Sequence, residues 1–430
     1  MLTAVHRRMT FSVRRRAAVV TLGVGVCFMA TPAPARAADP VLEWNDVARQ
    51  LSVVPALAPV QQIRAMAIVH VAVHDAVAAV TGVYEQHRST SAAPPGASAE
   101  AAAIGAAYGA LKGLFGDSAF LAAAYTGSLA AHAISPADPG LAFGGSVAEG
   151  ILALRQHDGA AVAAYPYIPP DAGTPGVWTP MSAAASAQAL LPGWGNVTPW
   201  VLRSGSQFRP DPPPALDGER YARDYNEVAQ IGALVSATRT DEQTQIALFW
   251  RASPTALWNP LLRHALQSQA LGLADTARTA ALFYLAAADA SVACWEAKYF
   301  YNFWRPQPAI VNGDVDGNDA TTGDAAWRPL LPTPAHPDFV SGHAVNSAAM
   351  ATVLADIFGD APGFAIQATS PQNIGFVRSW QTFSEGAEEV VNARVYSGIH
   401  FRTADDAGVR QGRQVARFVL THALRPIRGR

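Results

Sequence analysis

The sequence predicts a mainly α-helical protein, built as a multi-helix bundle with long irregular loops. Apolar residues recur at helical spacing through most of the chain, alternating strand patterns are scarce, and prolines concentrate in one central stretch. Half of the 430 residues are hydrophobic and only 15% are charged, which is enough apolar material for a large core. We therefore expect long helices packed around one another.

The first 37 residues are expected to be an export signal peptide. Arg14–Arg16 precede the apolar run AAVVTLGVGVCFMA, and a small-residue cleavage site follows and ends at Ala37. Because the apolar run is shorter than a bilayer span requires, we expect an exported protein, periplasmic or extracellular, with no stable membrane span after cleavage. The arginine cluster leaves both the general secretory and the twin-arginine route open.

Charge and cysteine content narrow the classes of partner. Six of the 31 basic residues and none of the 33 acidic residues lie in the leader, so residues 38–430 carry a formal net charge of −8 (25 minus 33). A mildly acidic chain is not typical of nucleic-acid-binding proteins. After cleavage Cys294 is the remaining cysteine, in an apolar run, and we interpret it as a buried structural thiol. The sequence leaves the oligomeric state open.

Residues 38–430 are expected to form a single domain with three successive parts. In the first part, 38–160, we expect helices near 41–52, 64–84, 99–112, 117–133 and 146–162. The second part, 161–218, is too rich in proline for regular helix or sheet, and its tryptophans indicate an ordered covering segment. The third part, 219–430, is expected to hold helices near 219–234, 241–252, 259–275, 276–304 and 344–358.

Two weaker patterns suggest metal ligands but are interpreted structurally. His70 and His74 share a helix face, yet no third ligand follows at helical spacing. The loop Asp314–Ala325 has the aspartate spacing of a calcium loop, but Asp319 and Ala325 stand where such a loop needs Gly and Glu. We expect two core histidines and a polar connecting loop.

Three short runs in the last third of the chain combine the groups that bind a tetrahedral oxyanion. They are KYFYNFWRP, HPDFVSGHA and ARVYSGIHF, which begin at Lys298, His336 and Ala393. Together they contribute three cations, two histidines and a Ser-Gly pair: Lys298, Arg305, Arg394, His343, His400, Ser341 and Gly342. Cations and backbone N–H groups bind phosphate-like anions, and imidazoles transfer protons or act as nucleophiles. The sequence therefore predicts an oxyanion site.

The spacing within these runs favours convergence. Lys298 and Arg305 are seven residues apart, so both side chains are expected to leave the same face of one helix, with Arg305 at its C-terminal end before Pro306. Ser341 is expected to cap the next helix and leave its first N–H groups facing the anion. Gly398 is expected to interrupt helical geometry and turn His400 toward the same place.

The order Lys-x6-Arg-Pro, Ser-Gly-His and Arg-x3-Gly-x-His resembles the vanadium-dependent haloperoxidases and the related type 2 phosphatidic acid phosphatases. The runs LLPGWGNVTPW, FRPDPPPAL and TRTDEQTQIALFW are similar to runs in bacterial secreted haloperoxidase-like proteins, so the resemblance covers nearly all of residues 38–430. It implies the helical fold of that family, a vanadate cofactor, and hydrogen peroxide and halide as reactants. The phosphatase branch implies phosphate in the same site and a phosphate ester as substrate.

The resemblance also implies a role for each site residue. His400 would bind the vanadium of vanadate, or become the phosphohistidine, and His343 would be the general acid/base. The oxygens of the anion would be bound by Lys298, Arg305, Ser341, Gly342 and Arg394.

The chain departs from the family pattern around this site. Val340 and Ala393 replace the usual proline and serine, and Ala404 stands where an acidic residue often follows the last histidine. Asp405 and Asp406 come next, and either is a candidate to orient His400. His336 is a candidate to line the pocket entrance, and equally a loop histidine that anchors Pro337.

Two reactions can use these residues, and we favour the first. A vanadate-dependent haloperoxidase would oxidise halide with hydrogen peroxide, whereas a secreted acid phosphatase would act through a phosphohistidine. The chain length, the N-terminal helices and the proline-rich segment favour the haloperoxidase branch. A non-enzymatic phosphate-binding role would not require both histidines.

Overall fold

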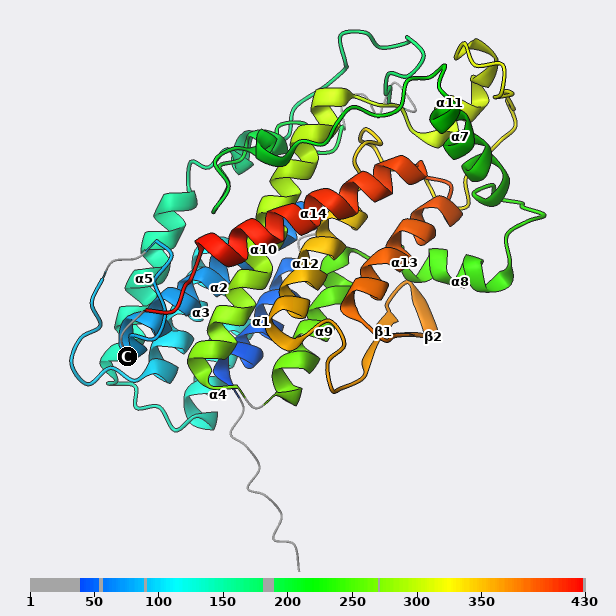
Figure 1. The fold of residues 1–430 in the computed structure, drawn as a ribbon. Coiled ribbons are helices and arrows are strands. Elements are labelled where there is room, and N and C mark those ends of the chain that lie inside the picture. The colour runs from blue at the N-terminus through cyan, green and yellow to red at the C-terminus, as the bar shows by residue number, and fades with distance from the viewer. Residues whose placement is uncertain (1–38, 54–56, 89–90, 181–188, 270, 428–430) are drawn as a thin grey trace, which may run out of the picture. The chain divides into compact units, whose positions relative to one another are not determined.

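The computed structural model describes residues 39–53, 57–88, 91–180, 189–269 and 271–427. The expected signal peptide and its cleavage site at Ala37 lie outside these residues. The described part is mainly α-helical, which confirms the predicted fold class (Figure 1). The residues Ala38–Arg430 pack as one compact unit, and its division into three parts remains a prediction.

The helices and strands occur in a simple order along the chain. The α-helices are α1 (Pro40–Val53), α2 (Pro59–Thr81), α3 (Ala99–Phe115), α4 (Ala119–Ala131), α5 (Pro139–Arg155), α7 (Glu219–Ile231), α8 (Asp241–Phe249), α9 (Pro254–Ser268), α10 (Leu273–Tyr301), α11 (Pro306–Val311), α12 (Gly342–Phe358), α13 (Phe383–Tyr396) and α14 (Arg402–His422). Short 3-10 helices are η1 (Ala160–Val162), η2 (Trp194–Asn196), η3 (Gly205–Phe208) and η4 (Gly313–Val315), and the strands are β1 (Ile366–Ser370) and β2 (Asn373–Trp380).

The long helix α10 is the centre of the bundle (Figure 1). It packs against α2 on one side and against α12 and α14 on the other. Its sequence, LADTARTAALFYLAAADASVACWEAKYFY, is apolar on nearly all faces and buried for most of its length. Such a helix is expected where neighbours surround it, and its alanines allow those neighbours to approach closely.

Helix α2 is also buried along most of its length. By length and composition it is long and apolar enough to cross a membrane, but 83% of its most apolar window is buried against the rest of the protein. It contacts α10, α3 and α5. This burial is the environment of a core helix.

Two glycines allow α3 and α5 to pack with their backbones in contact. A Cβ atom at Gly105 would lie 2.2 Å from the carbonyl oxygen of Leu141, and one at Gly144 would lie 2.1 Å from that of Ala102. Neither position has room for a side chain. The alanine- and glycine-rich sequence of these helices therefore reflects close packing.

The covering segment is anchored on α10 by buried polar contacts. Asp289 accepts hydrogen bonds of 2.6–2.9 Å from three successive backbone N–H groups, those of Trp200, Val201 and Leu202. Farther along α10, Glu296 accepts a 2.9 Å bond from Nε of Arg209. An irregular segment thus has fixed partners for its backbone, as the prediction of an ordered cover requires.

The structure corrects the predicted end of the central helix. Helix α10 ends at Tyr301, because Asn302 adopts a left-handed conformation (φ 48°) and its N–H closes the last turn on the carbonyl of Lys298. Arg305 instead precedes the short helix α11 as its N-cap residue. Lys298 and Arg305 therefore do not share a helix face.

Other segments differ from the sequence-based expectation. Helix α5 begins at Pro139, because the side chain of Asp138 caps its first turn, and it ends at Arg155. The antiparallel pair β1–β2, in which Ile366 lies opposite Trp380, was not predicted. Helices α13 and α14 were also not predicted.

The histidine pair and the aspartate loop, which resemble metal sites in sequence, are held by contacts with neighbouring residues of the protein. Nε2 of His70 lies 2.9 Å from Nδ2 of Asn45, and its ring stacks on Tyr284. Burial lowers the pKa of His70 to about 3 and that of His74 to about 4, so both are neutral at pH 7. In the loop, the carboxylate of Asp316 accepts from its neighbours Asn318 and Thr321. Within the described ranges, no group of three or more His, Cys, Asp or Glu side chains could hold a metal ion.

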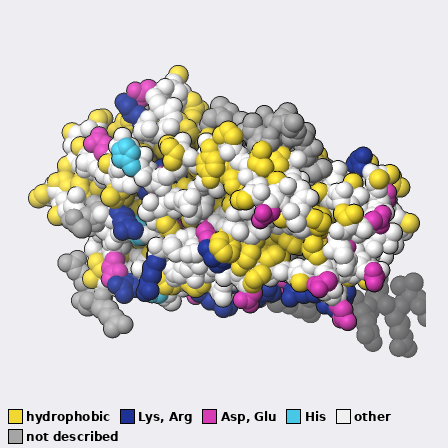
Figure 2. All heavy atoms as spheres, turned by 90° about the horizontal axis from the view of Figure 1, so that it is seen from above, with side chains coloured by type: hydrophobic (Ala, Val, Ile, Leu, Met, Phe, Trp, Pro, Cys, Tyr) yellow, Lys and Arg dark blue, Asp and Glu magenta, His cyan; other side chains and the backbone are white. Residues whose placement is uncertain are grey.

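The face drawn in Figure 2 carries both signs of charge. Basic and acidic side chains are interspersed along its edge, and hydrophobic side chains form patches between them. A mixture of this kind is consistent with the modest net charge of the chain.

Candidate active site

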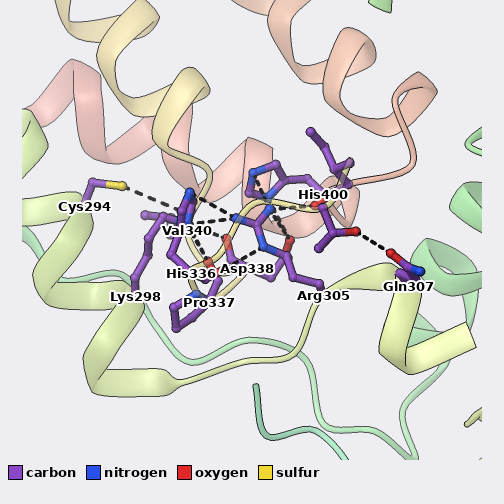
Figure 3. Close-up of polar contacts among 11 residues, drawn as sticks. Cys294, Lys298, Arg305, Gln307, His336, Pro337, Asp338, Val340 and His400 are labelled. Atoms are coloured by element: carbon purple, nitrogen blue, oxygen red, sulfur yellow. Dashed lines mark hydrogen bonds and ion pairs between the residues drawn. The ribbon is translucent and has the colours of Figure 1, made fainter. Parts of the chain in front are cut away.

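The three sequence runs meet at one end of α10 (Figure 3). Lys298 lies in the last turn of α10, Arg305 precedes α11, and the loop from His336 to Ser341 leads into α12. Arg394 lies in the last turn of α13, and His400 lies in the turn between α13 and α14. Helices distant in sequence therefore bring the predicted residues into one buried cluster.

Lys298 is fully buried and bound by two carbonyl groups. Its Nζ donates to the carbonyl oxygens of Pro337 at 2.7 Å and of Asp338 at 2.9 Å. Burial lowers the pKa of Lys298 to about 7, and the positive charge of Arg305 acts in the same direction. A nearby anion would raise this pKa again.

Arg305 is the centre of the cluster. Its guanidinium donates to the carbonyl oxygens of His336 at 2.8 Å and of Ile399 at 2.7 Å. It also lies 2.9 Å from Nε2 of His400 and 2.8 Å from Nδ1 of His336. A guanidinium has donors only, so Nε2 of His400 must be the acceptor in its contact with Arg305. His400 therefore directs the lone pair of Nε2 toward Arg305 and carries its proton on Nδ1.

The carboxylate of Asp338 lies against the ring of His400. Its Oδ1 lies 2.8 Å from Nδ1 of His400 and 3.7 Å from Nη1 of Arg305. Burial raises the pKa of Asp338 to about 7, and the neighbouring cations Arg305 and Lys298 oppose this rise. Sequence reasoning missed this residue, although it lies within the run HPDFVSGHA.

Asp405 and Asp406, the two candidates to orient His400, lie in the first turns of α14. Asp405 is buried, and its charge interacts with Asp338 and Arg394 rather than with His400 directly. Burial raises its pKa well above the ordinary value, whereas the neighbouring Ser341 hydroxyl lowers it. Asp406 is only partly buried on α14.

His343 is held by a carbonyl of the turn between α8 and α9. Its Nε2 lies 3.1 Å from the carbonyl oxygen of Ala252. Since a carbonyl only accepts, Nε2 carries the proton and Nδ1 keeps a lone pair. Burial, and next the charge of Arg394, hold the pKa of His343 well below its ordinary value. The residue is a neutral proton acceptor in this environment.

Arg394 approaches the same turn. Its Nη1 donates to the carbonyl oxygen of Trp250 at 3.0 Å, and its Nε is buried without a hydrogen-bond partner among the described residues. Burial lowers the pKa of Arg394 to about 10, while Asp405 acts in the opposite direction. A buried guanidinium with an unused donor is a strong position for an oxyanion.

Ser341 and Gly342 lie at the start of α12. Ser341 is the N-cap residue as predicted, but its hydroxyl does not cap the helix. The N–H groups of the first helical turn have no partners within the helix. A Cβ at Gly342 would lie 3.3 Å from the ring of Trp295 and 3.8 Å from Sγ of Cys294, so Gly342 packs directly on α10.

The charges of the cluster fit a bound anion. Three cations, Lys298, Arg305 and Arg394, are at most 4% exposed, and they face two buried carboxylates, Asp338 and Asp405. The burial that raises the pKa of both carboxylates weakens their negative charge. An excess of buried positive charge is costly unless an anion offsets it.

His336 and Cys294 complete the surroundings. His336 contacts Arg305 directly and its ring lies 5.2 Å from that of Trp295, so it lines the cluster instead of serving only as a loop anchor. Cys294 is buried beneath Val340, and burial raises the pKa of its thiol to about 11, as expected for a structural cysteine. A separate groove of about 770 Å³ is lined by α2, α3 and α5 and contains none of these residues.

The part of the chain that contains most of the cluster is similar in sequence to known proteins. Residues 278–429 match the family model described as the VCPO second helical-bundle domain. The vanadium chloroperoxidase of Curvularia inaequalis is 26% identical over an alignment of 196 residues that covers 38% of this chain and 32% of that protein. The matched segment therefore spans about a third of this curated relative.

Solved structures extend the similarity over most of the chain. A bacterial vanadium-dependent iodoperoxidase superposes with a TM-score of 0.78 at 27% identity, covering 92% of this chain and 100% of that one. A bacterial vanadium-dependent chloroperoxidase in its holo form gives a TM-score of 0.69 at 19% identity, covering 87% and 94%. The second similarity concerns the fold alone.

The chain is a helical bundle with a buried, cation-rich cluster at the end of its central helix. It is similar to vanadium-dependent haloperoxidases, in sequence through the family model over residues 278–429 and in structure over most of its length. The resemblance predicted from the three sequence runs is confirmed.

Proposed function

We propose that the protein is an exported vanadate-dependent haloperoxidase that oxidises halide with hydrogen peroxide. Lys298, Arg305 and Arg394 would bind oxygens of vanadate, together with Ser341 and Gly342 at the start of α12. His400 would be the ligand of vanadium. When bound, vanadate supplies the Lewis-acid centre at which peroxide becomes electrophilic toward halide.

The orientation of His400 carries this proposal. Oδ1 of Asp338 lies 2.8 Å from Nδ1 of His400, and Nε2 of His400 lies 2.9 Å from Nη1 of Arg305, so Nε2 would present its lone pair beside Arg305. A second group that fixes the tautomer of a ligating histidine also raises its basicity. With its proton on Nδ1, His400 is suited to be a ligand, and with its proton on Nε2, His343 is suited to be an acid/base.

His343 would move the proton during the reaction. The Ala252 carbonyl leaves Nδ1 of His343 as the acceptor, so we assign proton removal from peroxide to this atom. An anion in the cluster would offset the nearby cations and raise the pKa of His343, which lets the protonated ring return the proton. The cations contribute by stabilising negative charge in a water-poor site.

A phosphatase acting through a phosphohistidine is the second candidate. The same observation favours it, because a neutral His400 with an unprotonated Nε2 and a carboxylate beside Nδ1 is arranged as a nucleophile. His343 would then protonate the leaving oxygen, and the cations would bind phosphate instead of vanadate.

One paired assay separates the two functions. Purified protein is tested with and without orthovanadate, both for bromination of a phenol dye with hydrogen peroxide and bromide and for hydrolysis of a chromogenic phosphate ester. Vanadate-dependent bromination is the expected result. Ester hydrolysis that vanadate inhibits, without bromination, would assign the protein to the phosphatases.

A further inference from the structure

The turn between α8 and α9 holds two of the site residues from outside the three sequence runs. The carbonyl oxygen of Trp250 accepts from Arg394, and that of Ala252 lies 3.1 Å from Nε2 of His343. Two carbonyls two residues apart therefore bind a proposed anion ligand and the proposed acid/base. A rotation of this turn would move both contacts together.

The side chain of Trp250 fixes this turn. The residue is completely buried, and its indole Nε1 donates to Oε1 of Glu389 at 2.9 Å. Its ring packs between Trp258 and Trp380, with centroid distances of 6.3 and 5.7 Å. The carbonyl and the indole of one residue are thus both held.

Both contacts of Trp250 come from the same helix. Glu389 and Arg394 lie on α13, so the helix binds the indole with one side chain and the carbonyl with another. Glu389 is in turn held by Arg378 of β2, whose Nε lies 3.1 Å from Oε2. A two-point attachment restrains the orientation of the turn more strongly than either bond alone.

We propose that Trp250 and Glu389 are positioning residues for the oxyanion site. Through their hydrogen bond they fix the turn whose carbonyls orient Arg394 and His343. This inference rests on the proposed function, since it assumes that Arg394 binds the anion and that His343 transfers its proton. The β1–β2 hairpin contributes by supplying Arg378.

A purely stabilising role makes different predictions. In that case the importance of Glu389 lies in its ion pair with Arg378, and loss of the pair lowers stability while folded molecules bind vanadate normally. A positioning role requires the hydrogen bond to the indole, whether or not the ion pair is present. The two roles are separated by substitutions that remove one contact at a time.

Four variants of the full protein make the test. Trp250→Phe removes the indole donor and keeps the Glu389–Arg378 pair, whereas Glu389→Gln keeps an acceptor for the indole and removes the charge. Glu389→Leu removes both. Glu388→Gln is the matched control, because Glu388 lies next to Glu389 on α13 but is 63% exposed and pairs with Arg413. Orthovanadate affinity, turnover at saturating orthovanadate and the thermal midpoint are measured for each.

The positioning role predicts that affinity and stability respond separately. Trp250→Phe and Glu389→Leu weaken orthovanadate binding about tenfold and reduce turnover by a similar factor. Glu389→Gln lowers the thermal midpoint but binds within about twofold of the wild type, and Glu388→Gln matches the wild type in all three quantities. Wild-type affinity and turnover in Trp250→Phe would overturn the proposal, as would equal loss in Glu389→Gln and Glu389→Leu. Failure of the wild type itself to bind orthovanadate would instead overturn the proposed function, and the positioning role with it.

Discussion

Two buried charged residues on α10 differ in how the surrounding protein compensates their charge. Asp289, in the middle of α10, accepts three backbone N–H bonds from the covering segment. Lys298, nine residues later, is bound by carbonyl groups only, and its nearest charged neighbours include Arg305. The charge of Asp289 is satisfied by the fold, whereas the cluster around Lys298 keeps an excess of positive charge.

The difference separates a structural charge from a binding site. Burial of an ion is tolerated when hydrogen bonds or an opposite charge offset the lost hydration. Around Asp289 the protein supplies that compensation itself. Around Lys298 an external anion would complete it under the proposed function, so substitutions in the two regions should affect different quantities.

The largest expected effect is at His400. The substitution His400→Ala removes the proposed vanadium ligand and should abolish retention of orthovanadate after gel filtration, as measured by vanadium analysis. The exposed His422 provides a control, since His422→Ala leaves the cluster unchanged. Full retention by His400→Ala would show that the anion is held elsewhere.

Substitution of His343 should lower turnover but leave orthovanadate affinity nearly unchanged. His343→Ala keeps every proposed oxygen ligand, so orthovanadate affinity should change by less than about threefold, while turnover should fall about 10²- to 10⁴-fold with the loss of proton transfer. Steady-state bromination at saturating orthovanadate measures this. Unchanged turnover would remove His343 from the mechanism.

Asp338 should have an intermediate effect. Asp338→Asn replaces the charged acceptor on Nδ1 of His400 with an amide, and we expect about 10- to 100-fold weaker orthovanadate binding. Titration calorimetry gives the affinity, and Asp406→Asn is the comparison because Asp406 is partly exposed. If Asp406→Asn had the larger effect, the orienting role would belong to α14.

At Asp289 the effect should be on stability alone. Asp289→Ala leaves three N–H groups of the covering segment without their acceptor, which should cost about 3 kcal/mol of unfolding free energy. Urea denaturation measures this loss. The folded variant should bind orthovanadate like the wild type. A large loss of affinity would contradict the assignment of Asp289 to stability alone.

The smallest expected effect is a pH dependence caused by Lys298. Its pKa is about 7 in the free protein, and a bound anion raises it, so binding takes up a proton and affinity should fall as pH rises above about 7, by at most about tenfold per unit. Lys298→Arg keeps its charge at these pH values and should show a weaker decline. Comparing the two proteins at each pH cancels the ionisation of vanadate itself. Parallel curves would assign the dependence to another group.

Much of this account could be predicted from the sequence because the key residues occur in short, ordered runs. The helical fold followed from the apolar periodicity, and the three runs indicated residues that the structure brings together around Arg305. The end of α10 could not be predicted, because the aromatic run YFYNFW continues the helical pattern and the break depends on the conformation of Asn302.

Residues that act through tertiary contacts could not be identified from the sequence. Asp338 was overlooked although it lies between His336 and His343, because the direction of its side chain depends on the loop conformation. Trp250 and Glu389 are 139 residues apart, and nothing local links them. Strand β1 did carry a signal in the sequence, since apolar and polar residues alternate in its run IQATS and Pro371 follows it.

The central claim is that the excess positive charge at the end of α10 binds vanadate through His400. A crystal structure of the protein grown with orthovanadate tests it most directly. We predict one vanadium centre bonded to Nε2 of His400, with its oxygens within hydrogen-bonding distance of Lys298, Arg305 and Arg394. Vanadate bound at another place, or a cluster that stays free of it at saturating concentration, would contradict the claim.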